Sequence, residues 1–154
     1  MNGKGDTLLY RLLYPDSDTL RKYPLVIFLH GSGERGHDNE AQLKWGAQNF
    51  ANDRAMIMHP AIMIAPQCPA NMQWSSFTAG NGMQLILNPT PSKPMELLME
   101  LIRQSIKNLP VDTNRIYITG LSMGGYGTYE VGHFSWLGAY SDPLMMEWLF
   151  RQHK

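Results

Sequence analysis

Residues 115–127 read RIYITGLSMGGYG, and the fold of the whole chain follows from this stretch. It begins with four β-branched or aromatic residues, 116–119, a run typical of a buried strand. The run leads directly into a glycine-rich turn with a single serine, Ser122, at its centre. Glycines on both sides of a serine permit a sharp turn, because they lack the Cβ that would clash there. The stretch therefore predicts a strand, a tight turn that exposes Ser122, and a helix after it.

The turn matches the pattern G-x-S-x-G at positions 120–124. In that pattern a strained strand-to-helix turn lifts the serine Oγ above the sheet, where it can attack a carbonyl carbon. Glycine-rich turns also bind phosphate groups, but those patterns carry a lysine after the glycines or the spacing G-x-G-x-x-G. This sequence has neither feature. The pattern therefore favours Ser122 as a nucleophile.

The composition predicts one globular domain over residues 1–154. The chain is 44% apolar and carries 13 basic and 13 acidic side chains. No run of basic residues is present, so we expect no nucleic-acid partner, because phosphate backbones are bound by clustered Lys and Arg. The single cysteine, Cys68, excludes an internal disulfide and a cage of cysteines around a metal. We therefore expect neither a metal nor a cofactor.

The hydropathy pattern predicts a protein that does not enter membranes. No apolar run approaches the ~20 residues of a membrane span. Residues 1–4 lead into polar sequence rather than into the apolar core of a signal peptide. By default we expect a cytoplasmic location and no membrane partner.

Strand and helix patterns alternate along the chain, which predicts right-handed crossovers and a doubly wound, mostly parallel α/β sheet. Residues 25–29 are apolar on both faces, as in a strand covered by helices on two sides. Ser92 is placed to cap a helix with Pro94 in its first turn. Residues 67–91 are predicted to be irregular. The expected elements are strands over 8–14, 23–29, 61–65 and 116–119, and helices over 39–52, over 93–108 and from Asp142 onward.

Several motifs together resemble those of α/β-hydrolases of the polyhydroxybutyrate-depolymerase-like or feruloyl-esterase-like family. The resemblance covers residues 8–150, with an abrupt discontinuity between Glu130 and Val131. It implies an α/β-hydrolase fold that lacks its later strands, and an enzyme related to proteins that are often secreted. The motifs are YPLV at 23–26, HGSGERG at 30–36, APQCP at 65–69, RIYITGLSMGGYGT at 115–128, GHFSW at 132–136 and AYSDP at 139–143.

The resemblance and the chemistry of acyl transfer together suggest roles for individual residues. A serine hydroxyl is a weak nucleophile at neutral pH and needs an imidazole to take its proton, and the resemblance implies His133 as that base. The backbone N–H groups of Met123 and Ser32 are expected to form the oxyanion hole. Of the other histidines, we expect His30 to anchor a loop; His37, His59 and His153 are expected to lie at the surface or in packing.

The triad acid is missing from its usual place, because the family carries it between the elbow helix and the histidine. Asp142 is the candidate that remains, although it is explained better as the cap of the last helix. Trp74 and Trp136 are candidates to line a substrate cleft, with core packing as the alternative. Glu34 and Asp38 are expected to hold the oxyanion loop by hydrogen bonds.

These inferences predict a serine hydrolase that cleaves carboxylic esters, on a small molecule or on a polymer. Two alternatives stay open at this point. One is a serine peptidase on the same fold, since both reactions use the same elbow and oxyanion donors. The other is an inactive, shortened remnant that acts as a binding module. Loss of the later strands also predicts self-association through the exposed edge of the elbow strand.

Overall fold

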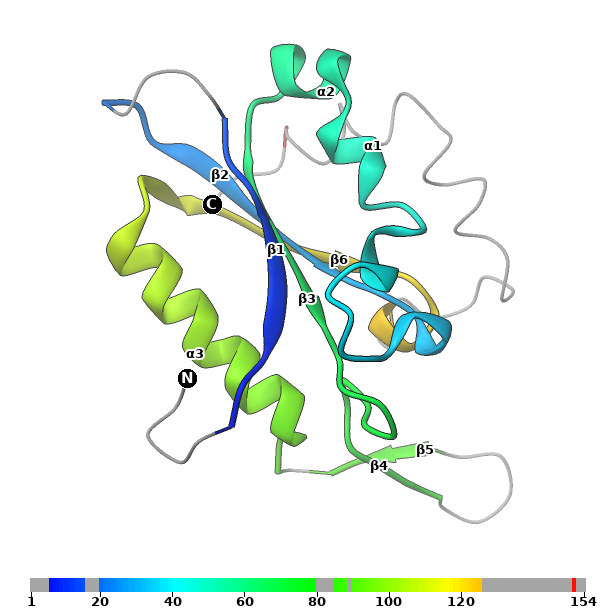
Figure 1. The fold of residues 1–154 in the computed structure, drawn as a ribbon. Helices are drawn as coiled ribbons and strands as arrows, with labels where there is room; N and C mark the ends of the chain where they lie inside the picture. Colours follow the sequence, from blue (N-terminus) through cyan, green and yellow to red (C-terminus); the bar gives the residue numbers. More distant parts are fainter. Residues whose placement is uncertain (1–5, 16–19, 80–84, 89, 126–150, 152–154) are drawn as a thin grey trace.

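The computed structural model of the protein describes residues 6–15, 20–79, 85–88, 90–125 and 151. A four-stranded sheet runs through its centre, with α3 on one face and α1 on the other (Figure 1). The strands are β1 (Leu9–Leu13), β2 (Tyr23–Leu29), β3 (Ile62–Gln67), β4 (Phe77–Ala79), β5 (Leu85–Leu87) and β6 (Val111–Gly120). The helices are α1 (Gln48–Ala51), α2 (Asp53–Met58) and α3 (Lys93–Asn108), with 3₁₀ turns η1 (Ser32–Glu34), η2 (Ala41–Leu43) and η3 (Ser122–Gly125).

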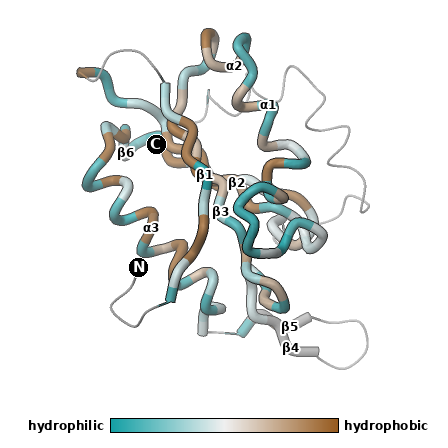
Figure 2. Tube along the Cα trace, in the orientation of Figure 1, coloured by the Kyte–Doolittle hydropathy of each residue, from teal (hydrophilic) through white to brown (hydrophobic). Residues whose placement is uncertain are grey.

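The central strand β2 is buried along its whole length. Leu25 and Ile27 belong to the core that packs against α3, whereas Val26 and Phe28 belong to the core that packs against α1. This alternation follows from the period of two in a strand, and it confirms that both faces of β2 are covered. Figure 2 shows hydrophobic residues on the central strands and in alternating bands along α3, as a helix with one buried face requires.

The sheet has the strand order β1-β3-β2-β6. The strands β2, β3 and β6 are parallel, and β1 runs antiparallel to β3. The sheet is therefore mostly parallel, as predicted, and the architecture is that of an α/β-hydrolase. Leu29 at the end of β2 pairs with Gly120 at the end of β6. The loops that leave these two strands consequently start side by side, at the carboxyl edge of the sheet where open α/β folds place their sites.

Helix α3 has the bounds and the cap that its sequence predicts. The Ser92 side chain accepts a hydrogen bond from the backbone N–H of Met95 at 3.3 Å, and Pro94 lies in the first turn. Leu97 and Leu98 are buried against the sheet. Ser92 Oγ also donates to the backbone oxygen of Trp74 at 2.6 Å, which links the start of α3 to the segment before it.

The single helix predicted over residues 39–52 is wrong. The segment forms η2 and then α1, and Gly46 between them has a φ of 77°, which no α-helix can contain. Ala47 and Phe50 nevertheless lie in the core, so the segment packs its apolar residues against the sheet. The apolar residues of this segment are therefore spaced as in a helix, although the backbone does not form one continuous helix.

Other predictions also differ from the structure. Strand β6 begins at Val111, five residues before the predicted start at residue 116. The strand expected to stop before Pro66 continues to Gln67, because β1 pairs with it there, Tyr10 opposite Pro66 and Leu9 opposite Gln67. Its pairing with β2 ends at Ile64, so the missing N–H of Pro66 falls beyond that ladder. Residues 67–91, predicted to be irregular, contain the antiparallel hairpin β4-β5. The helix expected from Asp142 lies outside the described residues. Within the described residues, no helix is long and apolar enough to span a membrane.

Candidate active site

Ser122 stands directly after the end of β6, with Leu121 as the only residue between them. Its φ is 49°, in the left-handed region that L-residues other than Asn, Asp and Gly seldom adopt. A non-glycine residue held there costs on the order of 1–3 kcal/mol, so the surroundings must enforce the conformation. This strained turn between a strand and a helical turn is the geometry that the G-x-S-x-G pattern requires.

The carbonyl group of Leu29 in β2 holds the turn in place. The backbone N–H of Leu121 donates to the Leu29 oxygen at 3.1 Å. A Cβ on Gly124 would lie 2.0 Å from that oxygen, and a Cβ on Gly120 would lie 2.6 Å from it. Neither position has room for a side chain. The first and last glycines of the motif are therefore needed because the backbone of β6 and η3 passes so close to the end of β2.

The loop after β2 lies against Ser122. A Cβ on Gly31 would lie 3.5 Å from Ser122 Cβ and 2.8 Å from Leu121 Cδ1. The turn η1, which begins at Ser32, contacts η3. The structure thus brings the segments of both predicted oxyanion donors, Ser32 and Met123, to the same end of the sheet.

His30 anchors the start of this loop from the inside. Its ring is buried, its Nε2 accepts the backbone N–H of Cys68 at 2.9 Å, and its Nδ1 lies 2.6 Å from the Gly31 oxygen. Since Nε2 accepts, Nδ1 must carry the proton and donate it. Burial lowers the pKa of His30, which favours the neutral ring. With both nitrogens engaged, His30 is an anchor and is not available as a catalytic base.

Gln67 and Asp38 fasten the rest of the loop. Gln67 Nε2 donates to the backbone oxygen of Glu34 at 3.1 Å and to Asp38 Oδ1 at 2.8 Å. Gln67 Oε1 accepts a hydrogen bond from the backbone N–H of Asn39 at 2.7 Å. Asp38 Oδ1 also accepts the backbone N–H groups of Ala41 and Glu40. These hydrogen bonds lower the pKa of Asp38 to about 2, and the bond from Ala41 has the largest effect. Asp38 therefore holds the loop through its side chain, and Glu34 takes part through its backbone.

Gln67, predicted only as a member of the APQCP motif, is the centre of this network. A glutamine at the end of a strand carries no local pattern that marks its function. Its three partners lie about thirty positions earlier in the chain, between residues 34 and 39. The importance of a buried amide becomes visible only when folding brings its partners together, because a buried polar group needs its hydrogen bonds.

The remaining predicted site residues divide into two groups. Trp74 is 1% exposed, donates its Nε1 hydrogen to the His30 oxygen at 3.1 Å and packs edge-on against the His30 ring. Its position is that of a core residue, which favours the packing alternative over a substrate contact. His133, Trp136 and Asp142 lie outside the described residues, and their roles stay predictions.

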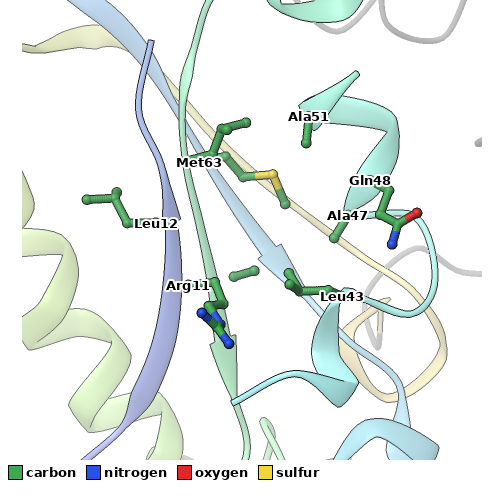
Figure 3. A pocket seen from close by; sticks show the side chains of 9 residues that line it. Arg11, Leu12, Leu43, Ala47, Gln48, Ala51 and Met63 are labelled. Carbon is green, nitrogen blue, oxygen red and sulfur yellow. The ribbon is translucent and has the colours of Figure 1, made fainter. Parts of the chain in front are cut away.

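A separate pocket of about 220 Å³ opens on the α1 face of the sheet, beside the edge strand β1 (Figure 3). Its lining is largely apolar, and neither the elbow nor residues 30–40 contribute to it. The lining residues are Arg11, Leu12, Leu13, Leu43, Ala47, Gln48, Ala51, Met63 and Ala65. The described part of the chain contains no group of three His, Cys, Asp or Glu side chains that could hold a metal.

Comparison with solved structures agrees with this architecture. The crystal structure of a thermostable esterase superimposes with a TM-score of 0.81 and 31% identity, over 94% of this chain and 59% of that one. Fluorophosphonate-binding serine hydrolase F of Staphylococcus aureus matches with a TM-score of 0.52 and 16% identity, which supports the fold alone. That match covers 77% of this chain and 43% of the staphylococcal protein.

Among curated proteins, the probable dipeptidyl-peptidase 5 of Aspergillus terreus is 28% identical over 120 residues, or 75% of this chain and 15% of the peptidase. The corresponding protein of Aspergillus niger is 35% identical over 60 residues, or 38% of this chain and 8% of the peptidase. The chain thus spans only a small part of these relatives.

A sequence model of the family described as phospholipase/carboxylesterase matches residues 16–132. The match includes the loop after β2, the whole of the described sheet from β2 to β6, and the elbow. The chain therefore belongs to the phospholipase/carboxylesterase family of α/β-hydrolases.

Proposed function

We propose that this chain is a serine esterase that cleaves carboxylic esters through an acyl-enzyme intermediate. Ser122 is the nucleophile, His133 the general base, and the N–H groups of Met123 and Ser32 stabilise the oxyanion. The finer relationship to polyhydroxybutyrate-depolymerase-like or feruloyl-esterase-like enzymes belongs to the same proposal. No cofactor takes part.

The chemistry runs in two balanced halves. Ser122 Oγ forms a bond to the ester carbonyl carbon while its proton passes to the imidazole of His133. The tetrahedral intermediate collapses, the bond to the alcohol oxygen breaks, and the imidazolium returns the proton to the leaving alcohol. Water then attacks the acyl-enzyme in the same way and releases the acid. Each oxyanion donor is worth about 3 kcal/mol of transition-state stabilisation.

The observation that carries the proposal is the conformation of Ser122. A serine with a φ of 49° between the end of β6 and η3 is strained, and Gly120, Gly124 and the Leu29 carbonyl group hold it there. Strain that the surroundings maintain at a polar residue, beside a second loop, is typical of an activated nucleophile.

Labelling with a fluorophosphonate tests the nucleophile. We expect the adduct on Ser122 alone, identified by mass spectrometry of the digested protein, and no adduct on Ser122→Ala. The circular dichroism spectrum of the variant should match that of the wild type, since a half-buried hydroxyl contributes little to the core. An adduct on Ser32, or none, would contradict the assignment.

His133 is tested by the dependence of the rate on pH. We expect ester hydrolysis to rise through a single transition at roughly pH 6.5, the ordinary pKa of a histidine. His133→Ala should remove that transition and most of the activity. A variant that keeps the profile would transfer the role of base to another histidine.

A serine peptidase is the second candidate, favoured by the similarity to the two probable dipeptidyl-peptidases. The two functions are separated by comparing the hydrolysis of 4-nitrophenyl acetate with that of a dipeptide 4-nitroanilide. We expect turnover of the ester and none of the anilide. The reverse result would establish the peptidase.

A further inference from the structure

Glu34, at the end of η1, has a buried side chain that the proposed mechanism does not use. The residue is 8% exposed, in a loop whose other acidic residues, Asp38 and Glu40, are exposed. Among the described residues, neither oxygen of its carboxylate has a hydrogen-bond or ion-pair partner. The neighbouring cation, Arg35, is directed elsewhere, with Nε donating to the Ser32 oxygen and Nη1 to the Met72 oxygen.

The Glu34 carboxylate is nevertheless in contact with solvent. In the described part of the chain, the one buried side-chain polar atom with neither a partner nor solvent access is Gln42 Oε1. The oxygens of Glu34 are absent from that class, so at least a small area of them is accessible.

The Glu34 carboxylate lies close to Ser122. The side-chain position of Gly31 is 3.0 Å from Glu34 Oε2 on one side and 3.5 Å from Ser122 Cβ on the other. The carboxylate and the serine side chain therefore both lie beside Gly31. Glu34 is therefore a buried acidic side chain next to the proposed nucleophile.

A nearly buried carboxylate without a partner is costly, because the protein has removed most of its water without replacing the lost hydrogen bonds. Retaining one beside a reactive serine is explained if a ligand supplies the missing partner. We infer that Glu34 is a specificity-determining residue that pairs with a cationic group next to the scissile carbonyl of the substrate. This inference rests on the proposed esterase function and names its substrate class: esters that carry an ammonium group.

The cation can belong to the acyl side or to the alcohol side of the ester, and two substrate pairs distinguish these cases. On the acyl side, the 4-nitrophenyl ester of trimethylammonioacetic acid is compared with 4-nitrophenyl 3,3-dimethylbutanoate. On the alcohol side, acetylcholine is compared with 3,3-dimethylbutyl acetate. Within each pair the shapes are the same, and only the positive charge differs.

The wild type, Glu34→Gln and Glu40→Gln are assayed on all four esters. Glu40→Gln is the matched control, because this substitution removes the same charge from the same loop. Glu40 lies at an exposed position and is paired with Arg11. We expect the ratio of kcat/KM for the cationic over the neutral ester to fall by about tenfold or more in Glu34→Gln, in one of the two pairs. The ratio in Glu40→Gln should stay within about twofold of the wild type, since exposed charges are screened. Comparing ratios cancels the intrinsic reactivity of each ester.

Binding to Ser122→Ala, measured by titration calorimetry with the same esters, makes the test independent of turnover. Tighter binding of the cationic ester that disappears on adding Glu34→Gln supports the inference. If this preference is present while the wild type neither hydrolyses esters nor labels at Ser122, the esterase proposal fails and the Glu34 site stands. If neither hydrolysis nor binding favours the cation, or if the preference survives Glu34→Gln, the inference is overturned.

Discussion

At the scale of single residues, the site depends on a close approach between the end of β2 and the elbow. The Leu29 carbonyl group lies so near Gly120 and Gly124 that neither position admits a Cβ. A loop glycine nearby, Gly33, has no atom within 4 Å of its side-chain position. A substitution of glycine by alanine should therefore affect stability very differently at Gly124 and at Gly33.

Gly124→Ala should destabilise the protein by about 3 kcal/mol, because a Cβ placed 2.0 Å from the Leu29 oxygen forces the elbow away from β2. Gly33→Ala should change the free energy of unfolding by less than about 0.5 kcal/mol. Chemical denaturation of both variants checks this. Equal stability of the two would mean that the elbow tolerates the displacement. Fluorophosphonate labelling of Gly124→Ala should also slow, since the turn can no longer hold Ser122 in place.

His30 makes stability depend on pH. Burial lowers its pKa below the ordinary 6.5, so the unfolded chain takes up a proton more readily than the folded protein. The contribution of neutral His30 to the free energy of unfolding is therefore fully present above about pH 6.5. It is lost as the pH falls through the pKa of His30 in the folded state. We expect the loss of stability between about pH 7.5 and about pH 5.5 to be smaller in His30→Gln than in the wild type. His37→Gln, at an exposed position of the same loop, should keep the wild-type dependence; an unchanged dependence in His30→Gln would refute the assignment.

At the scale of elements, the loop between β2 and α1 is a rigid part of the fold rather than a flexible connection. Residues at the end of β3 hold it, Cys68 through its N–H to His30 and Gln67 through its amide. The neighbouring strands β2 and β3 thus determine the shape of a loop that neither contains. A loop fixed in this way supplies preorganised backbone donors, which is what an oxyanion hole needs.

Gln67→Met should lower the free energy of unfolding by about 3 kcal/mol, because it leaves the N–H of Asn39 and the oxygen of Glu34 without their partner. The same substitution at Gln104, which donates to Glu100 on the exposed face of α3, should cost less than about 0.5 kcal/mol. Urea denaturation measures both. A comparable cost for the two variants would show that the network does not stabilise the loop.

At the scale of the whole molecule, β6 is an edge strand of the sheet as far as the structure describes the chain. In the part of the chain that the structure describes, β6 pairs with β2 alone and is the last strand of the sheet. Ile118 on this strand is 62% exposed. Exposed strand edges with apolar side chains pair with other chains unless something covers them.

We predict that the protein self-associates through β6, and that light scattering of the purified protein gives a mass above that of the monomer. Ile118→Lys should shift the population toward the monomer, because a charge on an edge strand opposes pairing. Ile57→Lys, at a position of α2 that is 78% exposed, should leave the mass unchanged. A monomeric wild type at high concentration would exclude the association.

Much of the fold was predictable from local pattern. The run of β2, the cap and apolar face of α3, and the strand and glycines of the elbow depend on residues within a few positions of one another. Local sterics and the periods of strand and helix act over that range, so these elements can be read without knowing their neighbours. Ser122 was identified for the same reason, since its turn is made by the glycines on either side of it.

The remaining features were decided by contacts between distant segments. Strand β3 continues past Pro66 because β1 pairs with it there, and Gly46 divides a helical pattern. Gln67 gains its importance from a loop about thirty residues earlier. The buried state of Glu34 and the need for Gly31 also arise only when the ends of β2 and β6 come together. Close packing and the desolvation of polar groups exist only in the folded chain, so the composition of the site around Ser122 is a property of tertiary structure.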